Sequence, residues 1–203
     1  ITIGKKNMYT KHHTRAFVLA SHDSGEADKV FALLTPDFGK VYAKAHGVRE
    51  HHARHKASLQ SLSEAHVSLV RGKNGWRITN VSPARSLYRE LANDRAKLLV
   101  LVRVLKLVRR LVAGEGNAEK VFAIISAFSD AITKDVDKET LSSAETLTVL
   151  RLLSVLGYLK QSAGLDSFIH NVEDLSQETL STFHVHTREA VKALNESLEA
   201  THL

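Results

Sequence analysis

The sequence predicts an α+β protein with two parts: a small β-barrel at the N-terminal end, followed by an all-α helical domain. Apolar and polar residues alternate with a period of two up to about residue 81, and turn residues recur between these short runs. After Pro83 the apolar spacing becomes helical. We expect the barrel over residues 9–82 and the helices over 83–203, with residues 1–8 as a leader or disordered N-terminus.

The composition is that of an ordinary soluble protein. The 203 residues are 43% hydrophobic and 25% charged, which is enough apolar material for a core. The absence of cysteine excludes disulfides and thiolate metal sites. No apolar run is longer than residues 98–102, whereas a helix needs roughly 20 apolar residues to cross a bilayer. We therefore expect a cytoplasmic protein without membrane contact.

Five strands are predicted before residue 82. Pro36 to Gly39 and the Asn74-Gly75 pair supply the turn residues that short hairpins require. The expected strands are residues 15–20, 29–35, 40–45, 58–70 and 76–81. Five short strands with one long loop before the fourth are typical of a closed barrel of the OB type.

The helical part begins with a helix that Asp94 can cap and that reaches about residue 112. Its apolar residues cover more than one face, so we expect it to be central and buried. A helix over 144–156 would be capped by Ser142 or Ser143, with Glu145 close behind, and stopped by Gly157. The remaining expected segments are 118–133, 166–171, 176–183 and 187–198, and short loops predict antiparallel neighbours.

A basic segment, residues 47–56, separates the third and fourth predicted strands. It holds three Lys or Arg and three His in ten residues and almost nothing that could enter a core. Residues 1–80 contain 13 Lys and Arg against 6 Asp and Glu, whereas residues 81–203 contain 15 against 16. A cationic loop on a β scaffold is typical of a surface that contacts a polyanion. A solvated connector is the simpler alternative.

We predict that this segment and its flanking strands bind nucleic acid. A guanidinium can donate to two phosphate oxygens, and an imidazole gains charge below about pH 6.5. An aromatic ring beside a hairpin turn can stack on a base, although a core or domain-interface tryptophan is the usual case. The predicted residues are Arg15, Lys44, Arg49, His51, His52, Arg54, His55, Lys56, Arg71, Lys73 and Trp76.

Neither catalysis nor a bound metal is expected. The chain lacks a phosphate loop, a Gly-x-Ser-x-Gly turn, an HExxH motif and a dinucleotide turn, so we expect no cofactor and no enzyme. The histidines of the basic segment, or His184 with His186, lack a carboxylate or thiolate partner at fixed spacing. In the helical part, arginines could border a groove for an acidic peptide; these are Arg89, Arg95, Arg103, Arg109, Arg110 and Arg151.

An ordered series of short segments resembles the RecO family of bacterial recombination mediators. The segments are residues 25–28, 35–40, 43–49, 53–54 and 59–62 in the front half, and 156–158 (Leu-Gly-Tyr) in the back half. Two features depart from the family. Glu50 stands where members usually carry a second arginine, and residues 159–166 contain none of the four cysteines of the zinc knuckle that many members carry.

The resemblance implies a function in recombinational DNA repair. It implies binding of single- and double-stranded DNA, annealing of complementary single strands and assistance to RecA loading near the nucleoid. It implies RecR and the acidic C-terminal tail of single-strand DNA-binding protein as partners. Two alternatives stay open: an OB-fold adaptor for RNA or ribosomes, and an interaction protein whose basic loop only aids solubility.

Overall fold

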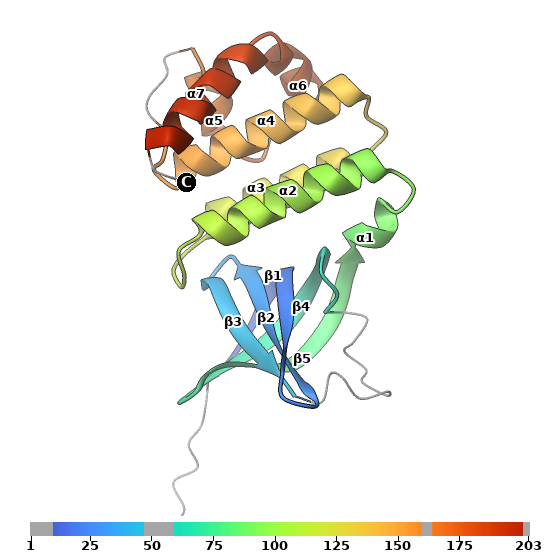
Figure 1. Ribbon diagram of the computed structural model, residues 1–203, viewed down its shortest axis with the longest axis vertical. Coiled ribbons are helices and arrows are strands. Elements are labelled where there is room, and N and C mark those ends of the chain that lie inside the picture. The colour runs from blue at the N-terminus through green and yellow to red at the C-terminus, as the bar shows by residue number, and fades with distance from the viewer. Residues whose placement is uncertain (1–9, 47–58, 160–163, 201–203) are drawn as a thin grey trace, which may run out of the picture.

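The N-terminal part of the protein is a closed five-stranded barrel (Figure 1). The computed structural model describes residues 10–46, 59–159 and 164–200. The strand order around the barrel is β1-β2-β3-β5-β4, and among these described strands only β3 and β5 pair in parallel. This is the OB-fold arrangement, so the predicted fold class is confirmed. The strands are β1 (Lys11–Ser24), β2 (Asp28–Thr35), β3 (Gly39–Ala45), β4 (Ser63–Gly72) and β5 (Gly75–Ser86).

Two strands are longer than the sequence pattern predicted. β1 continues to Ser24, four residues beyond its predicted end at residue 20, and pairs there with Asp28 at the start of β2. β5 passes through Pro83 to Ser86. The register of β4 against β5 shifts between Glu64 and Ala65, beside Pro83, and a proline is tolerated at such an irregularity.

Seven helices follow the barrel within the described part of the chain. Figure 1 shows α1 beside the barrel, and α2 and α3 lying between the barrel and helices α4 to α7. No helix among the described residues is both long and apolar enough to cross a membrane. The helices are α1 (Leu87–Glu90), α2 (Arg95–Leu111), α3 (Glu119–Ile132), α4 (Lys138–Val155), α5 (Asp166–His170), α6 (Gln177–His184) and α7 (Thr187–Ala200).

Side-chain caps define the starts of α2 and α4, with one correction to the prediction. Asp94 caps α2 as predicted, since its Oδ1 accepts a hydrogen bond from the backbone N–H of Lys97 at 3.0 Å. α4 begins earlier than the predicted caps Ser142 and Ser143, because Asp137 already accepts from the N–H of Thr140 at 2.7 Å. Both serines therefore lie inside the helix, and Ser143 is buried.

The two parts are joined by backbone hydrogen bonds between the β2–β3 turn and the α2–α3 loop. Lys40 N–H donates to the carbonyl of Gly114 at 3.0 Å, and Gly116 N–H donates to that of Phe38 at 3.1 Å. Gly39 sits at the centre with φ of 65°, where a Cβ would lie 2.7 Å from the Gly114 oxygen. Only glycine fits this position, so it fixes how the helices sit on the barrel.

Two apolar clusters make the core. One fills the barrel interior with inward residues such as Val18, Phe31 and Val41. The other joins the helices and extends onto the outer face of the barrel through Phe17 and Leu34. The helical part thus covers one side of the barrel, and the outward residues farther along β3 stay available to a ligand.

Candidate nucleic-acid interface

The predicted binding residues fall into two groups in the structure. The basic segment lies outside the described residues, and with it Arg49, His51, His52, Arg54, His55 and Lys56. The structure places the other five on the barrel: Arg15, Lys44, Arg71, Lys73 and Trp76.

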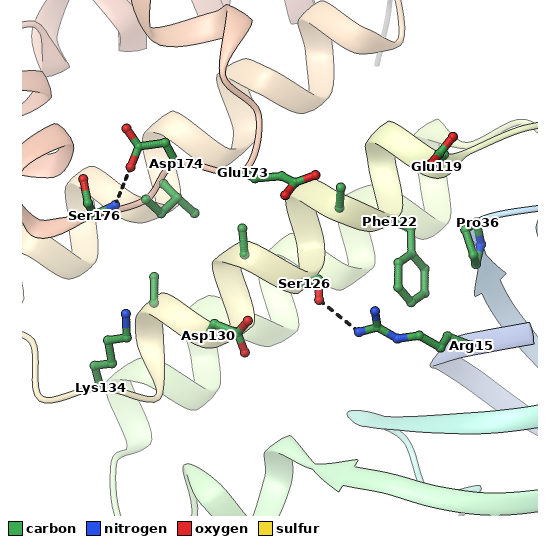
Figure 2. A pocket seen from close by; sticks show the side chains of 14 residues that line it. Arg15, Pro36, Glu119, Phe122, Ser126, Asp130, Lys134, Glu173, Asp174 and Ser176 are labelled. Atoms are coloured by element: carbon green, nitrogen blue, oxygen red, sulfur yellow. Dashed lines mark hydrogen bonds between the residues drawn. The ribbon is translucent and has the colours of Figure 1, made fainter.

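Arg15 lies between the barrel and helix α3. Its Nε donates to Glu64 Oε1 at 2.6 Å, and its Nη2 donates to Ser126 Oγ of α3 at 3.2 Å. Its guanidinium carbon also sits 5.0 Å from the centroid of the Phe122 ring, and Figure 2 shows this arrangement. These contacts make Arg15 part of the domain junction. Its side chain is still 48% exposed, so a phosphate contact by Arg15 stays a prediction.

Two further predicted cations are also ion-paired. Lys44 Nζ is 3.0 Å from Asp28 Oδ2, and Arg71 Nη1 is 2.9 Å from Glu115 Oε2 in the α2–α3 loop. Lys73, exposed in the β4–β5 turn, has no ion pair within the described part of the chain. Exposed pairs of this kind contribute only about 0–1 kcal/mol, so a phosphate can compete for the cation. The ion pairs therefore lower the positive electrostatic potential of the barrel surface but do not prevent phosphate from binding there.

For Trp76 the structure supports the alternative of a tryptophan buried at a domain interface, over a ring that stacks on a base. Its side chain is only 5% exposed, and its ring packs against His12 and Phe38, with centroids 5.8 Å and 5.0 Å away. Its Nε1 donates to Glu115 Oε1 at 3.1 Å. The first residues of β5 lie beside the α2–α3 loop, and this loop supplies the hydrogen-bond acceptor that an indole buried at a domain interface requires.

The structure identifies an exposed aromatic elsewhere on the barrel. Tyr42 is 55% exposed at the middle of β3, and Lys44 shares its outward face. The parallel pairing of β3 with β5 places Arg77 opposite Lys44. We call Tyr42, Lys44 and Arg77 the β3 face. An exposed ring flanked by cations is the combination that binds single strands, and OB folds use this region of the barrel.

The sequence contained the signal for the β3 face. Val41, Ala43 and Ala45 alternate with Tyr42 and Lys44, so an inward apolar set leaves the tyrosine and the lysine on the opposite side. The partnership with Arg77 depends on the β3–β5 pairing, which the sequence pattern does not contain.

Arg151 also lies elsewhere than predicted. It is 1% exposed, and its guanidinium donates to the carbonyls of Phe168 at 2.8 Å and Asp174 at 2.9 Å. Burial lowers its pKa to about 10, with the Asp174 carboxylate opposing that change. Arg151 therefore holds the chain around α5 against α4 and cannot border a peptide groove.

A hollow of about 570 Å³ lies between β1, α3 and residues 173–176 (Figure 2). Four carboxylates line it, against the cations Arg15 and Lys134. Hydrogen bonds from Thr179 and Ser176 lower the pKa of Asp174, so this carboxyl stays ionised at neutral pH. The excess of carboxylates does not favour phosphate, so we do not include the hollow in the candidate interface. Among residues 10–46, 59–159 and 164–200, no group of three or more metal-ligating side chains is placed to hold a metal.

Comparison with known proteins connects the barrel to one family. Residues 8–87 match the family described as recombination protein O N terminal. A DNA repair protein RecO of Heliobacterium modesticaldum is 33% identical over 108 residues, which are 53% of this chain and 39% of that protein. A DNA repair protein RecO of Roseiflexus is 28% identical over 151 residues, which are 74% of this chain and 51% of that protein.

The chain spans about half or less of the length of these relatives. The matched family region covers the whole barrel and ends at the start of α1, and the second relative aligns beyond it into the helices. With the OB-fold strand order of the matched region, these findings show that the barrel is similar to the N-terminal domain of recombination protein O, and that the chain is similar to part of two DNA repair proteins RecO.

Proposed function

We propose that this chain is a DNA-binding recombination mediator that anneals complementary single strands and assists RecA loading in DNA repair. The relatives' names support a role in DNA repair, and the description of the matched family supports a role in recombination. The observation that carries the proposal is the β3 face, where exposed Tyr42 lies beside Lys44 and Arg77 on an OB barrel. Stacking of one base on such a ring is worth about 1–3 kcal/mol.

The chemistry of annealing requires charge compensation. Two DNA strands repel each other, and a protein surface that replaces their condensed counterions lowers that repulsion. The basic segment and the β3 face both lie within residues 1–80, which carry all of the net positive charge of the chain. No nucleotide-binding motif is present in the sequence, so this mechanism depends on binding energy alone.

The proposed partners follow from the family. They are single- and double-stranded DNA, RecR, the acidic C-terminal tail of single-strand DNA-binding protein and, indirectly, RecA. The proposed location is the cytoplasm, at the nucleoid. Because stacking and phosphate contacts do not distinguish DNA from RNA, competition between single-stranded DNA and structured RNA separates this proposal from an RNA-binding adaptor.

The direct test measures DNA binding by fluorescence anisotropy and annealing of complementary oligonucleotides in the same samples. We expect Tyr42→Ala to weaken binding and slow annealing, while Tyr42→Phe keeps the ring and retains both. Tyr88→Ala is the matched control, since Tyr88 is 51% exposed on α1, away from the β3 face. Equal DNA affinity of the Tyr42→Ala variant and the wild type would contradict the proposal, because the β3 face would then not bind DNA through Tyr42.

A further inference from the structure

Helix α2 carries positive charge without any negative charge of its own. Its 17 residues include six Lys or Arg and no Asp or Glu. Lys97 is buried and its Nζ donates to the carbonyl of Lys134 at 2.6 Å, so it serves the helix packing. The other five are exposed, and we call them the α2 cationic face: Arg95, Arg103, Lys106, Arg109 and Arg110.

The cations of this face are paired less than those of the barrel. Arg103 donates to both carboxylate oxygens of Glu145 on α4, at 2.7 Å and 2.6 Å. The remaining four have no ion pair with any residue that the structure describes. The helix dipole favours cations in the last turn, which accounts for Arg109 and Arg110. It does not account for Lys106 or Arg95, which lie farther from the C-terminal end.

The C-terminal end of the α2 cationic face meets β3. Lys40 Nζ donates to the carbonyl of Arg109 at 2.8 Å, across the junction between the two parts. Burial and the neighbouring Arg109 guanidinium lower the pKa of Lys40, so two like charges are held close together there. Lys40 and Tyr42 lie on the same side of β3, because alternate residues of a strand share a face. In Figure 1, α2 and β3 both lie toward the viewer.

The two edges of the face can be assigned from these contacts. Arg103, paired with Glu145, marks the edge toward α4, and Arg109, beside Lys40, marks the edge toward the barrel. Between Arg95 and Arg110 the helix rises about 22 Å, which is comparable to roughly six nucleotides of a strand. The face is therefore long enough to follow a nucleic-acid backbone.

We propose that the α2 cationic face continues the β3 face, so that one single strand of nucleic acid crosses Tyr42 and runs on over α2. This inference rests on the proposed function and extends it to the helical part. Its occupant is the phosphate backbone, which supplies negative charge to the four cations of the face that have no ion pair with a described residue. The contact is independent of base sequence, as expected for charges on a helix surface that follow phosphates.

The test is a triple variant, Lys106→Gln, Arg109→Gln and Arg110→Gln. Glutamine forms helices nearly as well as lysine and arginine, so α2 should persist. The control removes three exposed cations from helices that α2 and α3 separate from the barrel: Lys138→Gln on α4 with Arg188→Gln and Lys192→Gln on α7. Affinity for an oligonucleotide of roughly 25 nucleotides, longer than one OB fold covers, is measured across a salt series.

We expect the α2 variant to bind at least about tenfold more weakly at low salt. The slope of log affinity against log salt should become shallower by about 2, since each lost phosphate contact contributes about 0.7. The control should match the wild type. If the triple variant unfolds earlier in a thermal melt, the double variant Lys106→Gln with Arg110→Gln should show a slope change of about 1.4.

The outcomes separate this inference from the proposed function. The inference alone is overturned if the wild-type protein binds DNA with a steep salt response and the α2 variant has the same affinity and slope as the wild type. A wild-type protein without salt-dependent binding overturns the proposed function, and the inference with it.

Discussion

The cations of the barrel and the cations of helix α2 are held in different ways. Arg15, Lys44 and Arg71 on the barrel each contact a carboxylate. On α2, Arg103 alone of the five exposed cations has an ion pair within the described structure. The net charge of each half suggests the reverse, since the first 80 residues are strongly basic and the rest nearly neutral. A domain's net charge therefore says little about where its local field is positive.

The largest expected effect tests the joint between the barrel and the helical part, where the β2–β3 turn contacts the α2–α3 loop. Gly39→Ala places a Cβ against the Gly114 carbonyl and forces a side chain into a positive-φ conformation. We expect a loss of roughly 2–4 kcal/mol in the free energy of unfolding, measured by urea denaturation. Gly25→Ala is the control, because Gly25 also has a positive φ but nothing lies within 4 Å of its Cβ position. Similar losses in both variants would show that the joint adds no constraint.

The next effect concerns the barrel alone. Tyr42→Ala should reduce the affinity for single-stranded DNA by about 1–3 kcal/mol, or roughly 5- to 150-fold, because one stacking surface is lost. Equilibrium anisotropy measures this change, and the melting temperature should stay close to that of the wild type, because the ring is exposed. A loss of the same size in Tyr88→Ala would mean that the position of the ring does not matter.

A smaller effect compares paired with unpaired cations directly. Glu115→Gln removes the charge that pairs with Arg71 and keeps an oxygen that can accept from Trp76 Nε1. Asp28→Asn removes the charge that pairs with Lys44. We expect each to raise DNA affinity about two- to fivefold at low salt, since a freed cation gains a phosphate contact. An unchanged DNA affinity in both variants would indicate that these ion pairs of the barrel already break when DNA binds.

The smallest effect concerns stability in acid and lies in the helical part. Hydrogen bonds from the Thr140 backbone lower the pKa of Asp137, and those from Thr179 and Ser176 lower the pKa of Asp174. Because the folded pKa values lie below the ordinary value of 3.8, both contributions are complete above about pH 4 and disappear as pH falls below it. Unfolding free energies should be level from about pH 7 to 5 with respect to these groups. Asp137→Asn, which still caps the helix, should show a weaker decline in acid.

Much of the fold could be predicted because its signals are local. Alternation within β3, the caps of α2 and α6 and the breaks between helices all lie in short stretches of sequence. The ends of β1 and β5 were missed, because long-range pairing extends a strand through residues that otherwise favour turns. The start of α4 was missed because Asp137 caps six residues before Ser143, and a sequence with several capping residues does not show which one the helix uses.

The site was predicted less completely because partners come from distant parts of the chain. Glu115 pairs with Arg71 and accepts a hydrogen bond from Trp76. Ser126 accepts a hydrogen bond from Arg15. No local sequence pattern predicts these contacts. The burial of Arg151 depends on carbonyls of the chain around α5. The acid-free composition of α2 was visible in the sequence, but averaging the charge over the helical half concealed it.

The most direct test of the account is the affinity of the wild-type protein for single-stranded DNA as a function of salt. If phosphates bind along the barrel and α2, log affinity should fall linearly with log salt between roughly 50 and 200 mM, with a steep negative slope. An affinity that stays constant over this range would contradict the claim that this protein binds the phosphate backbone of DNA. The absence of binding at the lowest salt concentration would contradict it too.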